Sequence, residues 1–377
     1  MPQETVLTNA RVVLEDEVIA GTVVLRDGMI AALETGGVGR GEDMDGDYLV
    51  PGLVELHTDH LESHYSPRPG VVWESIAALQ AHDAQVASSG ITTVFDCLRL
   101  GSDEDDGFER GEMRAIADAI ETAGAEDRLR ASHLIHLRCE VSAGNVLDHF
   151  ADFRGDSQVR LASLMDHAPG QRQFQTLDAY TLYYKKKRGL TDVEFERFIA
   201  RRIEESNRYA APHRRAIVDA CTERGIAIAS HDDATIEHVE ESKAFGVRLA
   251  EFPTSMEAAK ASHEAGMAVL MGAPNVVRGK SHSGNISAKA LADAGVLDVL
   301  SSDYVPFSLI HAPFVLAEAG MVLAESIRLV TATPARAVGL DDRGRIEPGL
   351  RADLVRVRHR SGIPVVRSVW REGRRVA

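Results

Sequence analysis

The chain has 377 residues, and its 57 Asp and Glu outnumber its 42 Lys and Arg, which gives a formal net charge of −15. Apolar residues make up 44% of the sequence, which is enough for a large core and excludes a disordered or fibrous chain. The acidic balance also argues against nucleic acid and anionic lipid as partners, because both require clustered Lys and Arg.

The sequence predicts a cytoplasmic protein that has no membrane segment. No apolar run reaches the ~20 residues that a membrane span requires. The first ten residues, MPQETVLTNA, lack the basic and apolar regions of a secretory signal. The three cysteines, Cys97, Cys139 and Cys221, are scattered along the chain and do not indicate a disulfide framework.

Both ends of the chain predict short β-strands. The first fifty residues hold β-branched runs separated by turns, among them the hairpin signal Asp27-Gly28. Residues 341–377 have the same character and carry ten Arg against five acidic residues. We therefore predict a small β-sandwich domain built from residues 1–50 and 341–377, and we expect the basic tail not to serve an active site.

The central part, residues 51–340, alternates short apolar strands with helical stretches such as 73–90 and 113–125. Eight strands with helical crossovers predict an α/β fold, a TIM-like (β/α)8 barrel. An unusually long connection, residues 168–215, predicts an excursion over the barrel mouth. The expected strands are 53–59, 92–97, 131–140, 159–167, 226–232, 247–253, 267–274 and 296–303.

Metal-binding and acid/base residues lie at the carboxyl ends of most of these strands, where barrels build their active sites. Residues two apart share a strand face, so His57 and Asp59 project together, whereas Cys139 points away from Glu140 and is expected to be buried. Asp166 and His167 are adjacent, so only one of them is expected to be a ligand. The candidate metal ligands are His57, Asp59, Glu140, His167 (or Asp166), His231 and Asp303.

The types of donor indicate the metal. Imidazole and carboxylate without thiolate suit Zn, Mn, Fe or Ni. The donors exceed the needs of one tetrahedral ion, so we predict two divalent ions, with zinc the first choice. Seven further histidines are expected to be surface or core residues and not ligands, and they are His82, His149, His213, His238, His263, His311 and His359.

These strand ends, together with VPGLVELHTD, the SSD of the eighth strand and the closing GRIEPGLRADLV, resemble the amidohydrolase superfamily over the whole chain. More narrowly, HTDHLESHYSPRP, SLMDHAPGQRQF, ASHDDAT and VLMGAPNVVRGKSHSGN are similar to the family of diphosphatases that act on ribose 1-methylphosphonate 5-triphosphate in the carbon–phosphorus lyase pathway. The usual His-x-His motif is His57-Thr-Asp59 here. The usual bridging Lys has no counterpart, so Glu140 would replace it, and the sixth strand lacks the usual His.

The resemblance implies a metal-dependent hydrolase that releases pyrophosphate from a small anionic substrate. Asp303 would bind one ion or the attacking water and act as general base. An amide or N-acetyl sugar deacetylase on the same barrel is the alternative, and the native metal and a homo-oligomeric state stay open. Cationic residues would hold the phosphates, and the candidates are Arg68, Arg172, Arg278, Lys280 and His282.

Overall fold

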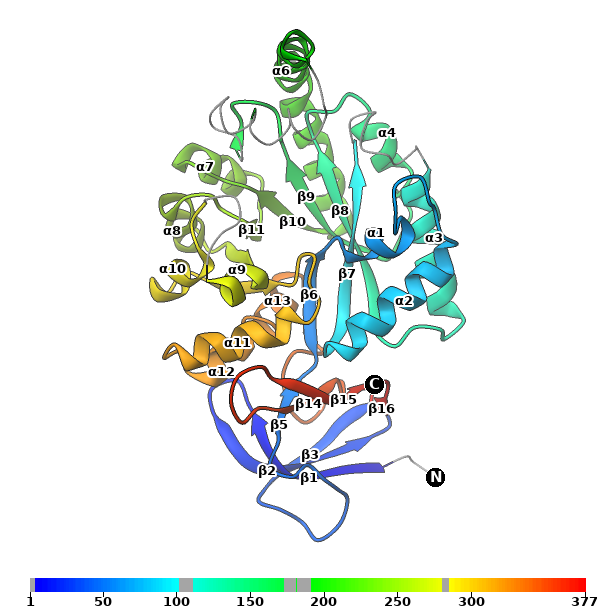
Figure 1. Cartoon of the computed structure of the whole chain (residues 1–377), viewed down its shortest axis with the longest axis vertical. Helices are drawn as coiled ribbons and strands as arrows, with labels where there is room; N and C mark the ends of the chain where they lie inside the picture. Colours follow the sequence, from blue (N-terminus) through cyan, green and yellow to red (C-terminus); the bar gives the residue numbers. More distant parts are fainter. Residues whose placement is uncertain (1–3, 102–110, 173–180, 182–190, 280–284) are drawn as a thin grey trace. The chain divides into compact units, whose positions relative to one another are not determined.

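The computed structural model describes residues 4–101, 111–172, 181, 191–279 and 285–377. The chain divides into two compact units. The first unit contains Met1–Asp96, Asp118–Leu134 and Met271–Ala377, and the second contains Cys97–Ala117 and Ile135–Leu270. Two eight-stranded sheets account for the strands of the described residues (Figure 1).

Strands from both ends of the chain build the first sheet, in the order β16-β15-β14-β5-β1-β2-β3, and β4 also pairs with β1. The two ends meet where β14 runs antiparallel to β5, with Leu354 opposite Pro51 and Val357 opposite Tyr48. This confirms a small β domain made from the termini, while the limits at residues 50 and 341 stay a prediction. The strands are β1 (Glu4–Val13), β2 (Val18–Arg26), β3 (Met29–Thr35), β4 (Glu42–Asp43), β5 (Tyr48–Pro51), β14 (Leu354–Arg358), β15 (Val365–Arg371) and β16 (Arg374–Arg375).

The hairpin between β2 and β3 shows why the sequence folds in this way. Arg26 pairs with Met29, so Asp27 and Gly28 form a two-residue loop. Both loop residues have positive φ, 51° and 83°, which a tight hairpin that matches the strand twist requires and which Asp-Gly readily adopts. Behind the sheet lies a core of buried apolar side chains that includes Leu7, Val23, Leu25, Leu49, Leu354 and Trp370.

The second sheet contains the eight parallel strands of the barrel, in chain order from β6 to β13. The last strand returns to the first, because Thr58 and Asp303 form a parallel bridge. The (β/α)8 barrel and its eight predicted strands are therefore confirmed. They are β6 (Leu53–Thr58), β7 (Ile91–Leu100), β8 (Ser132–Glu140), β9 (Val159–Met165), β10 (Ala227–His231), β11 (Leu249–Glu251), β12 (Ala268–Gly272) and β13 (Val299–Ser301).

Helices follow most of the barrel strands, and the helices predicted near 73–90 and 113–125 are present as α2 and α3. None of the helices among the described residues combines the length and the apolar character that a membrane crossing requires. The helices are α1 (His60–Tyr65), α2 (Ser75–Ser88), α3 (Glu112–Ala125), α4 (Val146–Ala151), α6 (Asp192–Arg224), α7 (Ile236–Ala244), α8 (Met256–Glu264), α9 (Ala273–Arg278), α10 (Ala288–Asp293), α11 (Ser308–Glu318), α12 (Leu323–Arg328) and α13 (Ala332–Ala337).

The predicted excursion over residues 168–215 is helical from residue 192 onward, where the 33-residue helix α6 begins and leads to β10. Residues 173–180 and 182–190 of this stretch lie outside the described residues. Thr191 and Glu194 form a reciprocal capping box at the start of α6. Gly225, with φ of 66°, ends it in the left-handed conformation that glycine adopts without strain. Both signals are visible in the sequence.

Candidate metal centre

A buried carboxylate fixes the end of β6 that carries His57. The Glu55 side chain accepts a hydrogen bond from the His57 backbone N–H at 2.7 Å and another from the backbone N–H of Ser302, just after β13. The Ser301 hydroxyl donates to the His57 carbonyl oxygen. Burial raises the pKa of Glu55 to about 7 in spite of these hydrogen bonds. Glu55 therefore joins the first and last barrel strands directly beneath His57.

Asp303 and Asp59 are brought together by their backbones. The Asp59 N–H donates to the Asp303 carbonyl oxygen at 3.3 Å, and the Thr58 hydroxyl donates to the same oxygen at 2.7 Å. Asp303 has φ of 55°, a left-handed conformation that costs a non-glycine residue about 1–3 kcal/mol and that clusters at functional sites. The chain thus turns at Asp303 under constraint from the neighbouring strand.

The second unit gathers a cluster of acids and imidazoles at the ends of β8, β9 and β10. His167 Nδ1 lies 2.7 Å from Glu140 Oε2, and His167 Nε2 lies 3.7 Å from Asp232 Oδ2. His231 Nδ1 lies 2.8 Å from the same Asp232 oxygen. The rings of His167 and His231 are 5.6 Å apart, edge to face. Three of the predicted ligands therefore lie together, and Asp232 joins them.

Opposite charges control the protonation of this cluster. Burial lowers the pKa of His167, but the attraction and hydrogen bonds of Glu140 and Asp232 outweigh it and raise that pKa to about 9. Burial likewise raises the pKa of Glu140, and the attraction of His167 and Arg202 brings it below its ordinary value. The ion pair between His167 and Glu140 is therefore stable at neutral pH when no cation is present.

The choice between Asp166 and His167 can be addressed from their surroundings. Asp166 is buried and accepts hydrogen bonds from the Ser206 hydroxyl on α6 at 2.9 Å and from the Ala168 N–H at 3.1 Å. Burial and the nearby Glu140 charge raise its pKa. His167, by contrast, faces the other donors, so the geometry favours His167 as the ligand.

The donor set fits a divalent cation. His167, His231 and Asp232 each offer one ligand atom, and these atoms lie within 4.8 Å of one another. Imidazole nitrogens and carboxylate oxygens are ordinary ligands of zinc and related metals. A ligating imidazole must be neutral, so a cation would displace the proton that His167 otherwise holds against the carboxylates. Asp232 also has positive φ, 58°, like Asp303.

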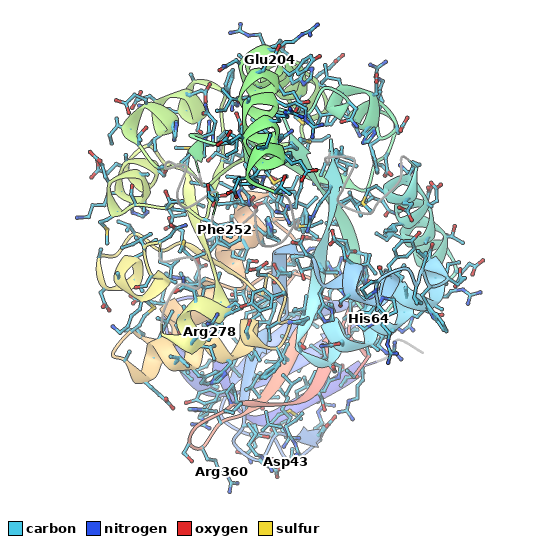
Figure 2. All side chains as sticks on the ribbon, turned by 45° about the horizontal axis from the view of Figure 1, so that its top comes forward. Asp43, His64, Glu204, Phe252, Arg278 and Arg360 are labelled. Carbon is cyan, nitrogen blue, oxygen red and sulfur yellow. The ribbon has the colours of Figure 1, made fainter. Side chains whose placement is uncertain are left out.

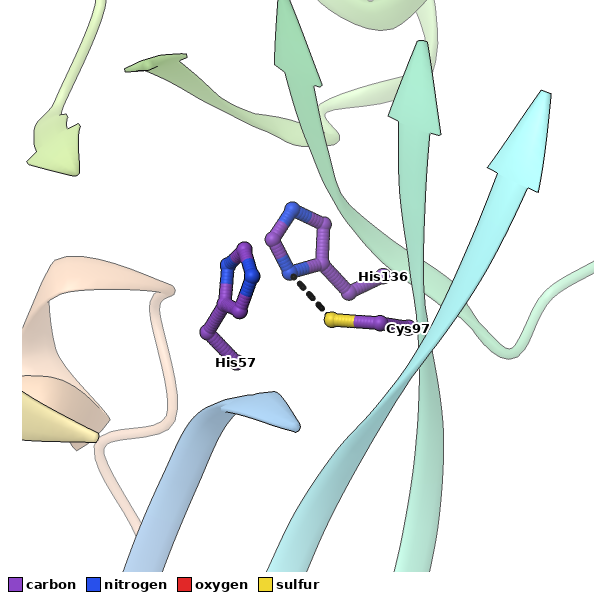
Figure 3. Close-up of side chains that lie close together, drawn as sticks. All are labelled: His57, Cys97 and His136. Carbon is purple, nitrogen blue, oxygen red and sulfur yellow. Dashed lines mark hydrogen bonds between the residues drawn. The ribbon is translucent and has the colours of Figure 1, made fainter. Parts of the chain in front are cut away.

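Sequence reasoning missed further donors inside the barrel strands. On β8, His136 is buried, and its Nδ1 lies 3.5 Å from the Cys97 sulfur (Figure 3). Its Nε2 lies 4.0 Å from Glu251 Oε1. Glu251 is the last residue of β11, the sixth barrel strand, in which the usual His of the amidohydrolase superfamily is absent. A signal for His136 was available, because it shares the strand face of Arg138 and Glu140. Cys139 is buried as expected.

The predicted phosphate-binding residues occupy different settings. Arg68 is exposed in a short bridge to Val71, and Arg278 is exposed at the end of α9 (Figure 2). Arg172 is buried, and its guanidinium is bonded to Asp233 and to Glu241, the latter at 2.6 Å. Burial lowers the pKa of Arg172 to about 10. Lys280 and His282 lie outside the described residues.

Imidazoles and carboxylates at the ends of parallel barrel strands are typical of metal-dependent hydrolases built on a barrel. Residues 48–376 match the family model described as the amidohydrolase family, and the chain belongs to that family. It is 44% identical over 376 residues, 98% of the chain and 100% of the relative, to the alpha-D-ribose 1-methylphosphonate 5-triphosphate diphosphatase of Escherichia coli (strain K12).

Solved structures agree on the fold. A Xaa-Pro dipeptidase has a TM-score of 0.65 and 15% identity, with 99% of each chain covered. The N-acetylglucosamine-6-phosphate deacetylase of Pasteurella multocida has a TM-score of 0.63 and 14% identity, with 98% of this chain and 99% of that chain covered. Identities this low show the shared architecture and say nothing about substrate.

Proposed function

We propose that this chain is a diphosphatase that hydrolyses alpha-D-ribose 1-methylphosphonate 5-triphosphate and releases pyrophosphate during phosphonate degradation. The observation that carries the proposal is the 44% identity to the Escherichia coli enzyme of that name across the full length of both chains. A water oxygen would bond to the phosphorus nearest the ribose, the P–O bond to the outer two phosphates would break, and the ribose 5-phosphate would remain.

As part of this proposal, two divalent ions, zinc foremost, would be held by residues at the strand ends. When bound, such ions lower the pKa of water from ~15.7 towards ~7 and neutralise phosphoryl oxygens, which offsets the charge of a triphosphate. The donor chemistry of His167, His231 and Asp232 supports the choice of metal. The proposed ligands are His57, Asp59, Glu140, His167, His231 and Asp303.

The side chains of the protein would perform the other tasks. Asp303 would accept the proton of the attacking water as general base, held in place by its contacts with β6. Arg68, Arg278, Lys280 and His282 would bind phosphoryl oxygens through charge-assisted hydrogen bonds. Arg172 would hold Asp233 and Glu241 in position by donating hydrogen bonds to them. We place the enzyme in the cytoplasm, acting on a small anionic molecule.

The test is a pyrophosphate-release assay of the zinc-loaded protein. The intact ribose phosphonate triphosphate should release pyrophosphate and leave the 5-phosphate, detected by phosphorus NMR. Nucleoside triphosphates and N-acetyl sugars serve as comparison substrates. Deacetylation without any pyrophosphate release would overturn the proposal and favour the deacetylase alternative.

A further inference from the structure

Three histidines on neighbouring helices form a cluster that the proposed catalytic ligands do not include. α1 carries His60 and His64, four residues apart and therefore on one helix face. α2 lies beside α1 (Figure 1). It carries His82, which is buried. The ring centroids of His60 and His64 are 4.8 Å apart, and those of His60 and His82 are 5.4 Å apart. Figure 2 labels His64 in this cluster.

The spacing of the nitrogens matches a metal site. Each ring offers one nitrogen, and the three nitrogens lie within 4.8 Å of one another. His60 Nδ1 and His82 Nδ1 are 3.1 Å apart. A tetrahedral ion with Zn–N bonds of 2.0–2.1 Å separates two nitrogen ligands by about 3.3 Å. Small side-chain movements would bring all three nitrogens to one ion.

A buried carboxylate orients the deepest of the three rings. His82 Nε2 lies 2.9 Å from Asp96 Oδ1, and both side chains are fully buried. The other Asp96 oxygen lies 2.7 Å from His133 Nδ1, so Asp96 is itself fixed. If His82 Nε2–H donates to Asp96, the neutral ring presents the lone pair of Nδ1 towards His60. Metal-binding histidines are commonly oriented by a carboxylate in this way.

His64 supplies the third nitrogen. Its Nε2 is shielded from solvent and makes no hydrogen bond of ordinary length and angle among the described residues, and the polar side chain of Gln85 lies near the ring. Burying such an atom without a partner is unfavourable, and a cation would satisfy it. Because His60 and His64 are only half-buried, an ion has access to the cluster from solvent.

We infer that His60, His64 and His82 form a separate metal site for a late first-row divalent cation, with Zn²⁺ the first choice. Three imidazoles without thiolate suit Zn²⁺, Ni²⁺ or Cu²⁺, and a water completes the coordination. The ion would be coordinated by both α1 and α2, and it would thereby hold the segment that directly follows Asp59 in position. In the alternative arrangement, His60 and His82 share only a hydrogen bond and bind no metal.

The test compares zinc content in three full-length proteins. The wild type, a His60→Asn/His64→Phe variant and a His263→Asn/His311→Phe control are equilibrated with the same free Zn²⁺ concentration and analysed by plasma mass spectrometry. We expect the cluster variant to bind one ion per chain fewer than the wild type, and the control to match the wild type. Equal zinc content in all three proteins would overturn the inference.

A second measurement keeps the inference falsifiable if the double variant does not fold. A single His64→Phe variant should bind the weakest zinc equivalent at least tenfold less tightly in competition with a chromophoric chelator. Anomalous scattering at the zinc edge from crystals of the wild type should place a peak among the three rings. An unchanged affinity, or density at the proposed catalytic ligands with none at this cluster, would overturn the inference.

Discussion

Asp303 combines a carboxylate just beyond a strand end with a left-handed backbone conformation and a bridge to Thr58. Asp303→Asn keeps the size of the side chain and removes its basicity. We expect turnover to fall by about 10²–10⁴-fold, the usual contribution of a general base, while the zinc content stays within a factor of two of the wild type. Steady-state pyrophosphate release and metal analysis on one preparation check this. A variant with near-normal turnover would remove Asp303 from this role.

His133 provides a pH-dependent contribution to stability. Burial lowers its pKa, but Asp96 and Asp83 outweigh burial and raise that pKa to about 9 from an ordinary value of 6.5. The charged form is thus favoured in the folded state by about 3 kcal/mol, at 1.36 kcal/mol per pKa unit. This contribution is complete below pH 6.5, declines above it and is lost as pH rises through about 9.

Urea unfolding of the metal-free wild type and a His133→Asn variant at several pH values measures this contribution. We expect the difference in unfolding free energy between the two proteins to shrink by about 3 kcal/mol between pH 6 and pH 10. A difference that stays constant over this range would show that His133 is neutral in the folded protein.

Residues at the ends of strands could be predicted, whereas those within strands could not. Alternation along a strand gives the face of each side chain, so His57, Asp59 and Glu140 were identified as candidates from the sequence. This alternation does not show which side chain on another strand a residue contacts. Asp96 was missed because its partners, His82 and His133, are distant in sequence.

Among the elements, the existence of all eight strands could be predicted and their limits could not. β11 and β13 have only three residues each, although the apolar runs that predicted them have seven and eight. The strands end early because the chain turns through positive φ just beyond them, at Phe252 and near Asp303. Of the proposed ligands, Asp59, His167 and Asp303 thus follow the strands, whereas His57, Glu140 and His231 lie at their ends.

The junction between the terminal sheet and the barrel depends on Gly52, which connects β5 to β6. A Cβ there would meet the Thr92 side chain, with Cγ2 at 2.8 Å, and Asp353 Cβ at 2.9 Å. Because neither neighbour is the end of a long flexible side chain, we expect Gly52→Ala to destabilise the protein by about 1–3 kcal/mol through overpacking.

Thermal unfolding at a fixed scan rate measures this effect, and Gly124→Ala is the matched control. Gly124 lies in α3, and a Cβ there meets nothing within 4 Å. Alanine is the better helix former by about 1 kcal/mol, so the control should be neutral or stabilising. If Gly52→Ala were as stable as this control, the close packing at the junction would be disproved.

Over the whole molecule, the charge of −15 and an anionic substrate are compatible because charges act locally. The basic tail is largely neutralised within the terminal sheet, where Arg356 bonds Asp45 and Asp47, and Arg358 bonds Asp47. That the tail does not serve the active site stays a prediction. Net charge controls solubility and long-range steering, whereas bound cations and individual Arg side chains control the interaction with phosphate.

Metal binding should stabilise the whole fold, because the proposed ligands come from strands far apart in sequence and an unfolded chain cannot present them together. A ligand that binds only the folded state at 1,000 times its Kd adds about 4 kcal/mol to the unfolding free energy. We therefore expect chelation to lower the unfolding temperature and Zn²⁺ to restore it. The His60→Asn/His64→Phe variant should retain the part of this shift that the strand-end ligands provide. Calorimetry over a series of Zn²⁺ concentrations measures both effects, and an unfolding temperature that does not respond to zinc in the wild type would contradict any metal centre in this barrel.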